Sequence, residues 1–165
     1  MTIDVRHGGL GDIDDVEPLW SSMLEHHRVL TGHELPMRRR DQSWVLRREE
    51  YVGWLEEGSG MLFLARSGDS AALAGYAFLR WHRSGSTWDF GPLIGEVESL
   101  AVAPSVRGGG VGMALLDACR GELRTRGIDF WSVDVVESNP AVRLYERAGF
   151  RPNYRKMFGL VDPPG

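Results

Sequence analysis

The sequence predicts a single α/β domain, and three observations support this prediction. A length of 165 residues suffices for one domain with a full core and is too short for two ordinary domains. Segments with the two-residue alternation of strands and segments with helical spacing follow one another along the chain. Residues 96–136 have the pattern strand, helix, strand, whose two strands are expected to be parallel and joined by a right-handed connection. We therefore treat residues 1–165 as one domain.

The N-terminal third predicts a strand followed by two helices. Ile3 and Val5 alternate with polar residues as in a short strand, and the acidic residues from Asp12 onward supply the first turn of a helix over 12–27. A loop rich in Gly, Pro and Arg comes next. Residues 41–57 then place apolar side chains at helical spacing, which predicts a second helix.

The middle of the chain predicts a hairpin and an apolar loop. Two β-rich runs, 61–65 and 73–81, flank a turn at Gly68-Asp69 and are expected to pair antiparallel. Residues 84–95 are rich in Gly, Ser and Pro but contain aromatic side chains, so we expect a substrate or a partner chain to cover this loop.

The last third contains the most regular pattern. The expected elements are strands over 96–102 and 130–136, a helix over 109–126 closed by Gly127, a helix capped by Asn139 and ended by Gly149, and one or two terminal strands reaching about residue 160.

Composition excludes several classes of protein. The chain has 19 basic and 23 acidic residues and a net charge of -4, so no overall positive field favours nucleic acid as a partner. Cys119 is the only cysteine, which excludes an intramolecular disulfide and a cysteine-based zinc site and fits a reducing, cytoplasmic location. The histidines form no metal-ligand pattern, and no apolar run is long enough to predict a signal peptide or a membrane span.

A glycine-rich stretch, residues 104–112, lies between a predicted strand and a predicted helix. Glycines let backbone amides approach a ligand closely, and the positive end of the helix dipole favours an anion. Arg107 adds a full positive charge beside these amides. The stretch therefore suits phosphate binding, although a turn that uses glycine only for its conformation explains it equally well.

Two other phosphate-binding loops compete for this stretch. A Walker loop requires a lysine after its last glycine, and the only lysine is Lys156, so this type is excluded. A dinucleotide-binding fold places a small residue where Leu115 stands, yet Asp134 lies about where that fold keeps its ribose-binding acid. The dinucleotide alternative therefore stays open as the lesser one.

The pattern Arg107-x-x-Gly110-x-Gly112 resembles the acetyl-CoA pyrophosphate loop of the GNAT superfamily of N-acetyltransferases. Residues 97–104 are similar to that family's fourth strand, and residues 139–150, with Asn139 and Tyr145, resemble its second conserved block. The resemblance implies a GNAT-like mixed, partly splayed β-sheet flanked by about four helices, with acetyl-CoA as co-substrate and no metal.

The resemblance also implies where the cofactor lies. In the family, the fourth strand splays from the fifth, and the pantetheine arm of CoA occupies the gap. The implied cofactor-binding residues are Leu100, Ala101, Val102, Arg107, Gly108, Gly109, Gly110, Val111, Gly112, Asn139 and Tyr145. A purely structural helix cap explains Asn139 equally well.

Acetyl transfer to an amine needs a proton acceptor for the amine and a proton for the departing thiolate. Tyr145 matches the family's usual general acid, although a core tyrosine is the structural alternative. Glu96 and Glu98 are two residues apart on one predicted strand and should share a face. We favour Glu98 as base, then Glu96, then Asp134 on the neighbouring strand, and water can also carry the proton.

The resemblance implies an N-acetyltransferase acting on a primary amine of a small molecule or peptide, by direct transfer in a ternary complex. The loops 27–41 and 84–95 are expected to shape the acceptor pocket, and a homodimer is expected at the level of the family. The alternative from another class is a non-catalytic acyl-CoA-binding sensor or interaction domain. Neither the loops nor their aromatic residues select one acceptor.

Overall fold

The computed structural model describes residues 2–68 and 70–165 and shows one mixed five-stranded sheet with four α-helices. The strands lie in the order β1-β2-β3-β4-β5 across the sheet. Their bounds are β1 Ile3–Gly8, β2 Gly60–Ser67, β3 Gly75–Arg83, β4 Leu93–Val102 and β5 Trp131–Val133, and the helices are α1 Glu17–Leu30, α2 Arg40–Glu56, α3 Val111–Thr125 and α4 Val142–Arg147. The predicted fold class is confirmed.

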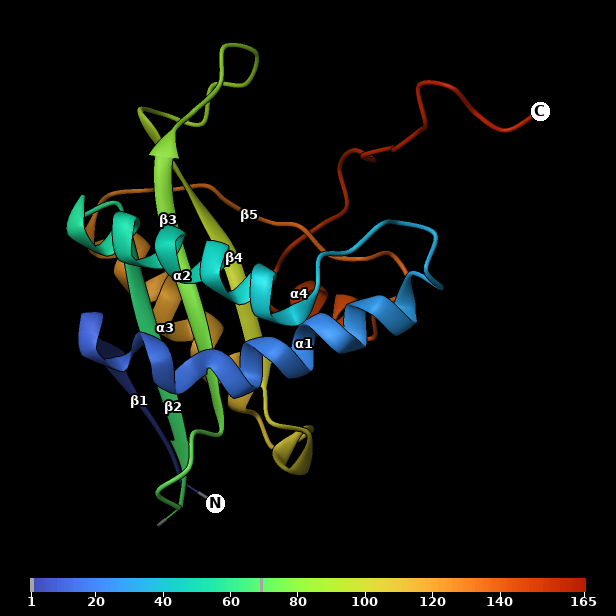
Figure 1. The fold of residues 1–165 in the computed structure, drawn as a ribbon. Coiled ribbons are helices and arrows are strands. Elements are labelled where there is room, and N and C mark those ends of the chain that lie inside the picture. Colours follow the sequence, from blue (N-terminus) through green and yellow to red (C-terminus); the bar gives the residue numbers. More distant parts are fainter. Residues whose placement is uncertain (1, 69) are drawn as a thin grey trace.

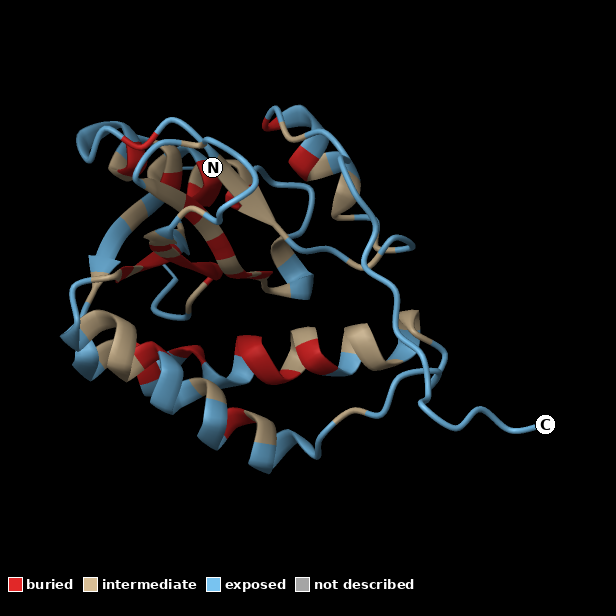
Figure 2. Ribbon diagram, turned by 90° about the horizontal axis from the view of Figure 1, so that it is seen from above, coloured by how far each residue is buried: buried red, intermediate tan, exposed pale blue. Residues whose placement is uncertain are grey.

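The molecule has three layers, with α1 and α2 on one face of the sheet and α3 and α4 on the other (Figures 1 and 2). Under α1 and α2, a core cluster includes Trp20, Trp44 and Phe78. On the opposite face, the cluster under α3 includes Leu115 and Cys119. Both faces of the sheet are therefore covered, which is why the central strands have apolar residues in consecutive positions.

The strand pairing follows the sequence prediction closely. β2 and β3 form the expected antiparallel hairpin, although Asp69 of its predicted turn lies outside the described residues. β4 and β5 are parallel and are joined through α3, as the strand-helix-strand pattern predicts. These elements place the glycine-rich stretch at the end of β4.

A β-bulge interrupts the pairing of β3 with β4. Val97 lies opposite Leu79 and Ser99 lies opposite Phe78, so Glu98 is the extra residue. Val97 packs on the α3 and α4 side, whereas Ser99 is buried on the α2 side against Tyr51. The bulge thus changes the alternation of β4 at Glu98, and bulges commonly re-aim a side chain in this way.

β4 and β5 separate directly after this bulge. Their paired residues are limited to Gly95 to Val97 on β4, opposite Trp131 to Val133 on β5. Beyond Val97, β4 continues to Val102 without a partner on its β5 side. This divergence shortens the predicted strand 130–136 to three residues and confirms the partly splayed sheet.

The N-terminal helix begins later than predicted. A 3-10 helix, Leu10–Val16, precedes α1, and the Asp12 carboxylate accepts a hydrogen bond from the Gly9 amide at 2.8 Å and pairs with Arg6. Pro18 lies in the first turn of α1, where a missing N–H costs nothing. The acidic run therefore closes a separate turn, and the regular helix starts around the proline.

The predicted terminal strands are wrong. In the described chain no strand follows β5, and residues 151–165 are all exposed, including Tyr154, Met157 and Phe158. A β-rich segment forms a strand only where a partner strand is available. Because β5 ends at Val133, little of its edge is available to this tail.

Among the described residues, no helix is both long and apolar enough to cross a bilayer.

Candidate active site

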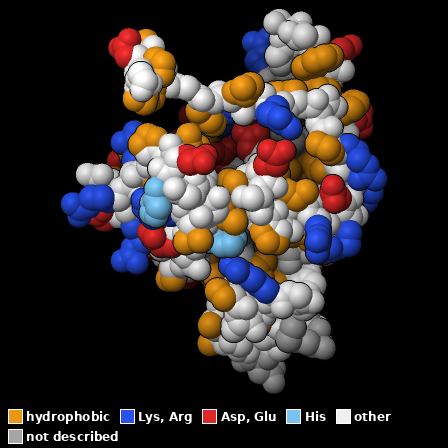
Figure 3. Space-filling view, turned by 90° about the vertical axis from the view of Figure 1, so that its right-hand side faces the viewer, with side chains coloured by type: hydrophobic (Ala, Val, Ile, Leu, Met, Phe, Trp, Pro, Cys, Tyr) orange, Lys and Arg blue, Asp and Glu red, His pale blue; other side chains and the backbone are white. Residues whose placement is uncertain are grey.

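The two strand acids lie on the sheet face covered by α1 and α2. Glu96 contacts His82 of β3, and Glu98 contacts Arg47 of α2 and Arg80 of β3. His82 and Arg80 are alternate residues of one strand and share a face, so the two glutamates share that face too. The prediction that Glu96 and Glu98 share one face is confirmed. Figure 3 shows a hollow in the molecular surface with acidic side chains on its floor.

Glu98 is held by two arginines. Arg47 Nη1 donates to Glu98 Oε1 at 2.7 Å, and Arg80 Nη1 lies 3.9 Å from Glu98 Oε2. Only 17% of the Glu98 side chain is exposed, and the Arg47 guanidinium also lies over the Trp20 ring. Both carboxylate oxygens of Glu98 thus face guanidinium groups. This geometry leaves Glu98 less accessible to an amine than a carboxylate without such partners.

Glu96 has a different partner, which the sequence analysis did not identify. His82 Nε2 lies 3.0 Å from Glu96 Oε2, and His82 Nδ1 lies 3.0 Å from the carbonyl oxygen of Arg83. Both ring nitrogens face oxygen atoms, and the His82 side chain is 39% exposed. Glu96 thus contacts an imidazole, a group that can both donate and accept a hydrogen bond, whereas Glu98 is paired with guanidinium groups. Only the register of β3 with β4 reveals the contact between Glu96 and His82.

A buried hydroxyl cluster lies beside the bulge. The Tyr51 hydroxyl donates to Ser99 Oγ at 2.6 Å and lies 3.2 Å from the Tyr76 hydroxyl. Burial raises the pKa of Tyr51 to about 12 and raises the pKa of Tyr76 as well. The three hydroxyls stay neutral and fix Ser99 inward. They hold the bulged segment that carries Glu98.

The glycine-rich loop at the end of β4 exposes a set of free amides. Gly108 and Gly110 have φ values of 80° and 90°, in the left-handed region that favours glycine. In the described chain, five backbone amides here have no hydrogen-bond acceptor, those of Gly108, Gly110, Val111, Gly112 and Met113. Four of them are at or near the N-terminus of α3, which has 15 residues and a positive dipole end. Free amides at the positive end of a helix dipole are an arrangement that favours an anion.

The other residues of the loop have distinct positions. Arg107 is exposed, and its Nε lies 3.4 Å from the carbonyl oxygen of Val102. Gly109 donates its amide to Val106 and is thereby turned away from a ligand. A Cβ on Gly112 would lie 2.7 Å from Leu144 Cδ2, so this glycine also allows α3 to approach α4. Gly112 thus has a packing function in addition to its free amide.

The unpaired part of β4 leads from the acids to this loop. Leu100 and Val102 face α3, while Ala101 is buried on the α1 and α2 side. Their backbone has no strand partner toward β5. The backbone of Leu100, Ala101 and Val102 is therefore placed to bind an extended ligand arm, as strand edges do.

Tyr145 projects from α4 into the cluster that contains Val97 and Leu116, and its ring lies edge-on to Phe150. Burial raises the pKa of Tyr145 to about 12, so its phenol keeps its proton. This position fits both the core tyrosine and the proton donor of the sequence analysis. Cys119, as predicted, is buried in the core, and burial raises the pKa of its thiol to about 12.

Asn139 is a cap, but not at the helix start that the sequence predicts. Its side-chain oxygen accepts from the Ala141 amide at 2.9 Å, and α4 begins only at Val142. The turn that includes Pro140 comes first, so the predicted helix loses its first residues. The cap satisfies Asn139 without a ligand.

Asp134 and the aromatic loop residues lie apart from the acids. Asp134 follows the last residue of β5, is 85% exposed and lies 3.6 Å from Lys156 Nζ. The structure does not bring it into contact with Glu96 or Glu98. In the loop before β4, Phe90 contacts Phe130 in a tilted arrangement with ring centroids 5.0 Å apart, whereas Trp88 is exposed.

Within the described residues, no group of three or more His, Cys, Asp or Glu side chains is arranged to hold a metal ion.

Comparison with known proteins agrees with this geometry. The model of the acetyltransferase (GNAT) family matches residues 20–150. A mycothiol acetyltransferase from Thermobispora bispora is 38% identical over 112 residues, which cover 66% of this chain and 36% of the relative. The chain thus spans little more than a third of the length of this relative.

Solved structures share the whole fold. A GCN5-related N-acetyltransferase from Ralstonia eutropha JMP134 superposes with a TM-score of 0.77 at 19% identity and covers 98% of this chain and 100% of its own. A predicted acetyltransferase from Clostridium acetobutylicum, solved with acetyl-CoA, has a TM-score of 0.69 at 14% identity, with 97% of each chain covered.

Proposed function

Because the chain belongs to the GNAT acetyltransferase family, we propose that it transfers an acetyl group from acetyl-CoA to a primary amine by direct transfer in a ternary complex. The amine belongs to a small molecule or a peptide. A homodimer and a cytoplasmic location remain predictions.

One observation carries the proposal. The five free amides of the glycine loop lie at the end of the unpaired segment of β4, and the strand acids lie at its other end. An anion-binding site, an open strand edge and proton-exchanging groups thus follow one another along one strand. This order fits a long ligand with a phosphate-bearing end and a reactive end.

The residues fit acetyl-CoA as the donor. The amides of Gly110, Val111 and Gly112, with Arg107 beside them, would hold the pyrophosphate. The unpaired backbone of Leu100 to Val102 would hold the pantetheine arm. When bound, acetyl-CoA supplies an acetyl thioester, whose carbonyl carbon is the electrophile.

The partners of the two glutamates lead us to prefer Glu96 as the base, in place of Glu98. Glu98 is paired with Arg47 and Arg80, whereas Glu96 is hydrogen-bonded to a partly exposed histidine. We therefore assign proton acceptance from the amine to Glu96, directly or through water. The new N–C bond forms as the C–S bond breaks, and the Tyr145 phenol donates a proton to the thiolate.

The first experiment is calorimetric titration with acetyl-CoA, CoA and NAD in parallel. Acetyl-CoA binding that weakens about tenfold in Arg107→Ala supports the donor site. Preference for NAD would instead support a dinucleotide-binding domain. A screen of amine acceptors for thiol release then separates an enzyme from a non-catalytic acyl-CoA sensor.

A further inference from the structure

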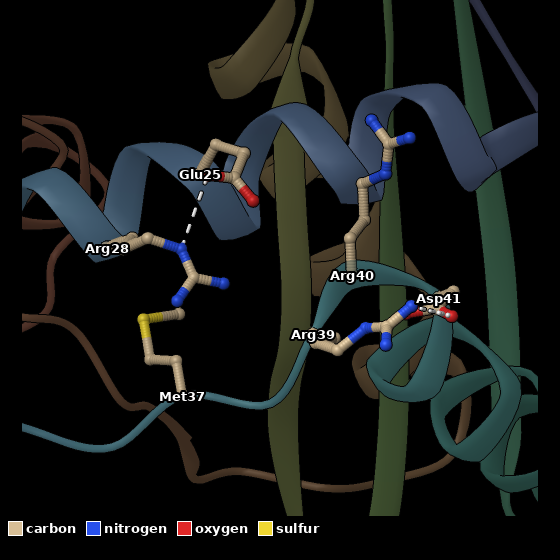
Figure 4. A pocket seen from close by; sticks show the side chains of 6 residues that line it. All are labelled: Glu25, Arg28, Met37, Arg39, Arg40 and Asp41. Carbon is tan, nitrogen blue, oxygen red and sulfur yellow. Dashed lines mark hydrogen bonds and ion pairs between the residues drawn. The ribbon is translucent and has the colours of Figure 1, made fainter.

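An open cavity lies between α1 and the start of α2. It measures about 500 Å³ and is lined by Glu25, Arg28, Met37, Arg39, Arg40 and Asp41. Figure 4 shows these side chains converging from α1, the connecting loop and α2, with strands of the sheet passing behind them. The cavity therefore opens on the same face of the sheet as Glu96 and Glu98.

The charges of this cavity do not cancel. Arg28 pairs with Glu25 at 3.3 Å, and Arg39 pairs with Asp41 at 3.1 Å. Arg40 has no hydrogen-bond or ion-pair partner in the described chain. Three arginines against two carboxylates leave one net positive charge, beside the N-terminal end of the 17-residue helix α2.

The arginines are also partly fixed in place. Arg28 Nη2 donates to the carbonyl oxygen of Arg38 at 3.2 Å, which ties the connecting loop to α1. Asp41 holds Arg39 from the first turn of α2. The surroundings of Arg40 are thus ordered, while its own guanidinium is free to bind a ligand. A planar guanidinium matches a carboxylate in geometry.

The face of α2 links this cavity to the strand acids. Arg40, Trp44 and Arg47 follow one another at spacings of four and three residues, so they share one helix face. Arg47 makes the ion pair with Glu98. Arg40 and Arg47 are seven residues apart, which places Arg40 about 10 Å along the helix from the arginine that holds Glu98.

We propose that the acceptor is an amine that carries a carboxylate about 10 Å from its amino group, with Arg40 binding the carboxylate. This inference rests on the proposed acetyl transfer, because it places the amine beside the strand acids, at the end of the α2 face that Arg47 marks. A single net positive charge matches a monoanion, and the arginines disfavour polycationic acceptors. A tripeptide with a free C-terminus has this span, at about 3.5 Å per residue.

The test compares triglycine with triglycinamide, which differ only in the terminal charge. Each is titrated into the protein saturated with CoA, and each is assayed for acetylation with acetyl-CoA. We expect triglycine to bind about tenfold more tightly than the amide and to be acetylated with a correspondingly lower KM. In Arg40→Gln this preference should fall below about threefold, with the amide unaffected.

Arg124→Gln is the matched control, because Arg124 is exposed on α3 on the opposite side of the sheet. It should keep the full preference for triglycine. Equal binding of the two peptides, no binding of triglycine at millimolar concentration, or a preference that survives Arg40→Gln would each overturn the inference.

The two proposals fail in different ways. Acetylation of both peptides without preference leaves the acetyltransferase assignment standing and overturns the carboxylate site. Preferential binding of triglycine without acetylation supports the carboxylate site and contradicts the proposed function.

Discussion

The two sides of β4 are bordered very differently. Toward β3 the strand is paired along its whole length, from Leu93 to Val102, with the bulge at Glu98 as the only irregularity among the described pairs. Toward β5 it is paired at three residues only. One side therefore fixes the position of the strand, and the other side leaves backbone groups for a ligand. Side chains on the strand gain rigid support, while its backbone stays accessible toward β5.

The largest effect on activity is expected from replacing Glu96, the proposed base, which lies where β4 is still paired with both β3 and β5. Glu96→Gln should lower kcat/KM by about 10²- to 10³-fold, because amide nitrogen and oxygen cannot accept the amine proton. Glu98→Gln is the control and should cost less, since Arg47 and Arg80 already neutralise it. Steady-state kinetics across pH measure both. A greater loss in Glu98→Gln, in a variant of unchanged stability, would return the base to Glu98.

The pairing of β4 with β3 is disturbed most directly by a substitution at Gly75, which lies opposite Val102. A Cβ there would lie 2.8 Å from the carbonyl oxygen of Ala101 and 3.0 Å from Val111 Cγ1. Gly75→Val should therefore lower the free energy of unfolding by about 3 kcal/mol, because backbone has to move. Urea denaturation measures this loss. Gly121→Val is the control, because a Cβ at this position meets no atom within 4 Å. An equal loss of unfolding free energy in this variant would show that the steric contact at Gly75 is not the cause.

Tyr145, which packs against Val97 of β4, makes the free energy of unfolding depend on pH. Burial raises the pKa of Tyr145 to about 12 from the usual 10, so the folded protein keeps a proton that the unfolded chain loses. The contribution of this proton to the free energy of unfolding is complete below pH 10 and is lost as pH rises from 10 to 12, on the order of 3 kcal/mol.

Tyr145→Phe should therefore make the free energy of unfolding fall less steeply between pH 10 and 12. Tyr51, Tyr76 and Cys119, whose pKa values burial also raises, contribute to the remaining slope. Denaturation curves at fixed pH values measure the difference. An unchanged slope would contradict the burial of Tyr145.

The smallest effect on stability is expected from a substitution in the glycine-rich loop that follows the unpaired part of β4. Gly110→Ala places a Cβ at a φ of 90°, which costs about 1 kcal/mol, and crowds the free amides. We expect a Kd for acetyl-CoA raised at least about tenfold with the sheet intact. Gly159→Ala, in the exposed tail, should change neither quantity. Normal acetyl-CoA affinity in Gly110→Ala would exclude the loop as the donor site.

The sequence predicts the fold better than it predicts the site. Periodicity identifies the β2–β3 hairpin and the unit that joins β4, α3 and β5, because these elements are local and covered on both faces. It also places Glu96 and Glu98 on one face correctly. The glycine loop is found from its composition alone.

Other features depend on contacts that are distant in sequence. Tyr51 is 48 residues from Ser99, and Arg47 is 51 residues from Glu98. The bulge at Glu98, and with it the separation of β4 from β5, has no signature in the residue pattern. For the same reason, His82 is invisible as the partner of Glu96 until the register of β3 is known. The terminal segment fails for the opposite reason, since its apolar residues predict a strand that has no partner.

The lysine that pairs with Asp134, Lys156, is the only lysine of the sequence. The protein therefore presents a single side-chain ε-amine to any acyl donor that it holds. Chemical self-acylation on lysine is thus limited to one adduct of known position. Intact-mass measurement during turnover has almost no lysine background, and any mass gain on an added amine can be assigned to that amine.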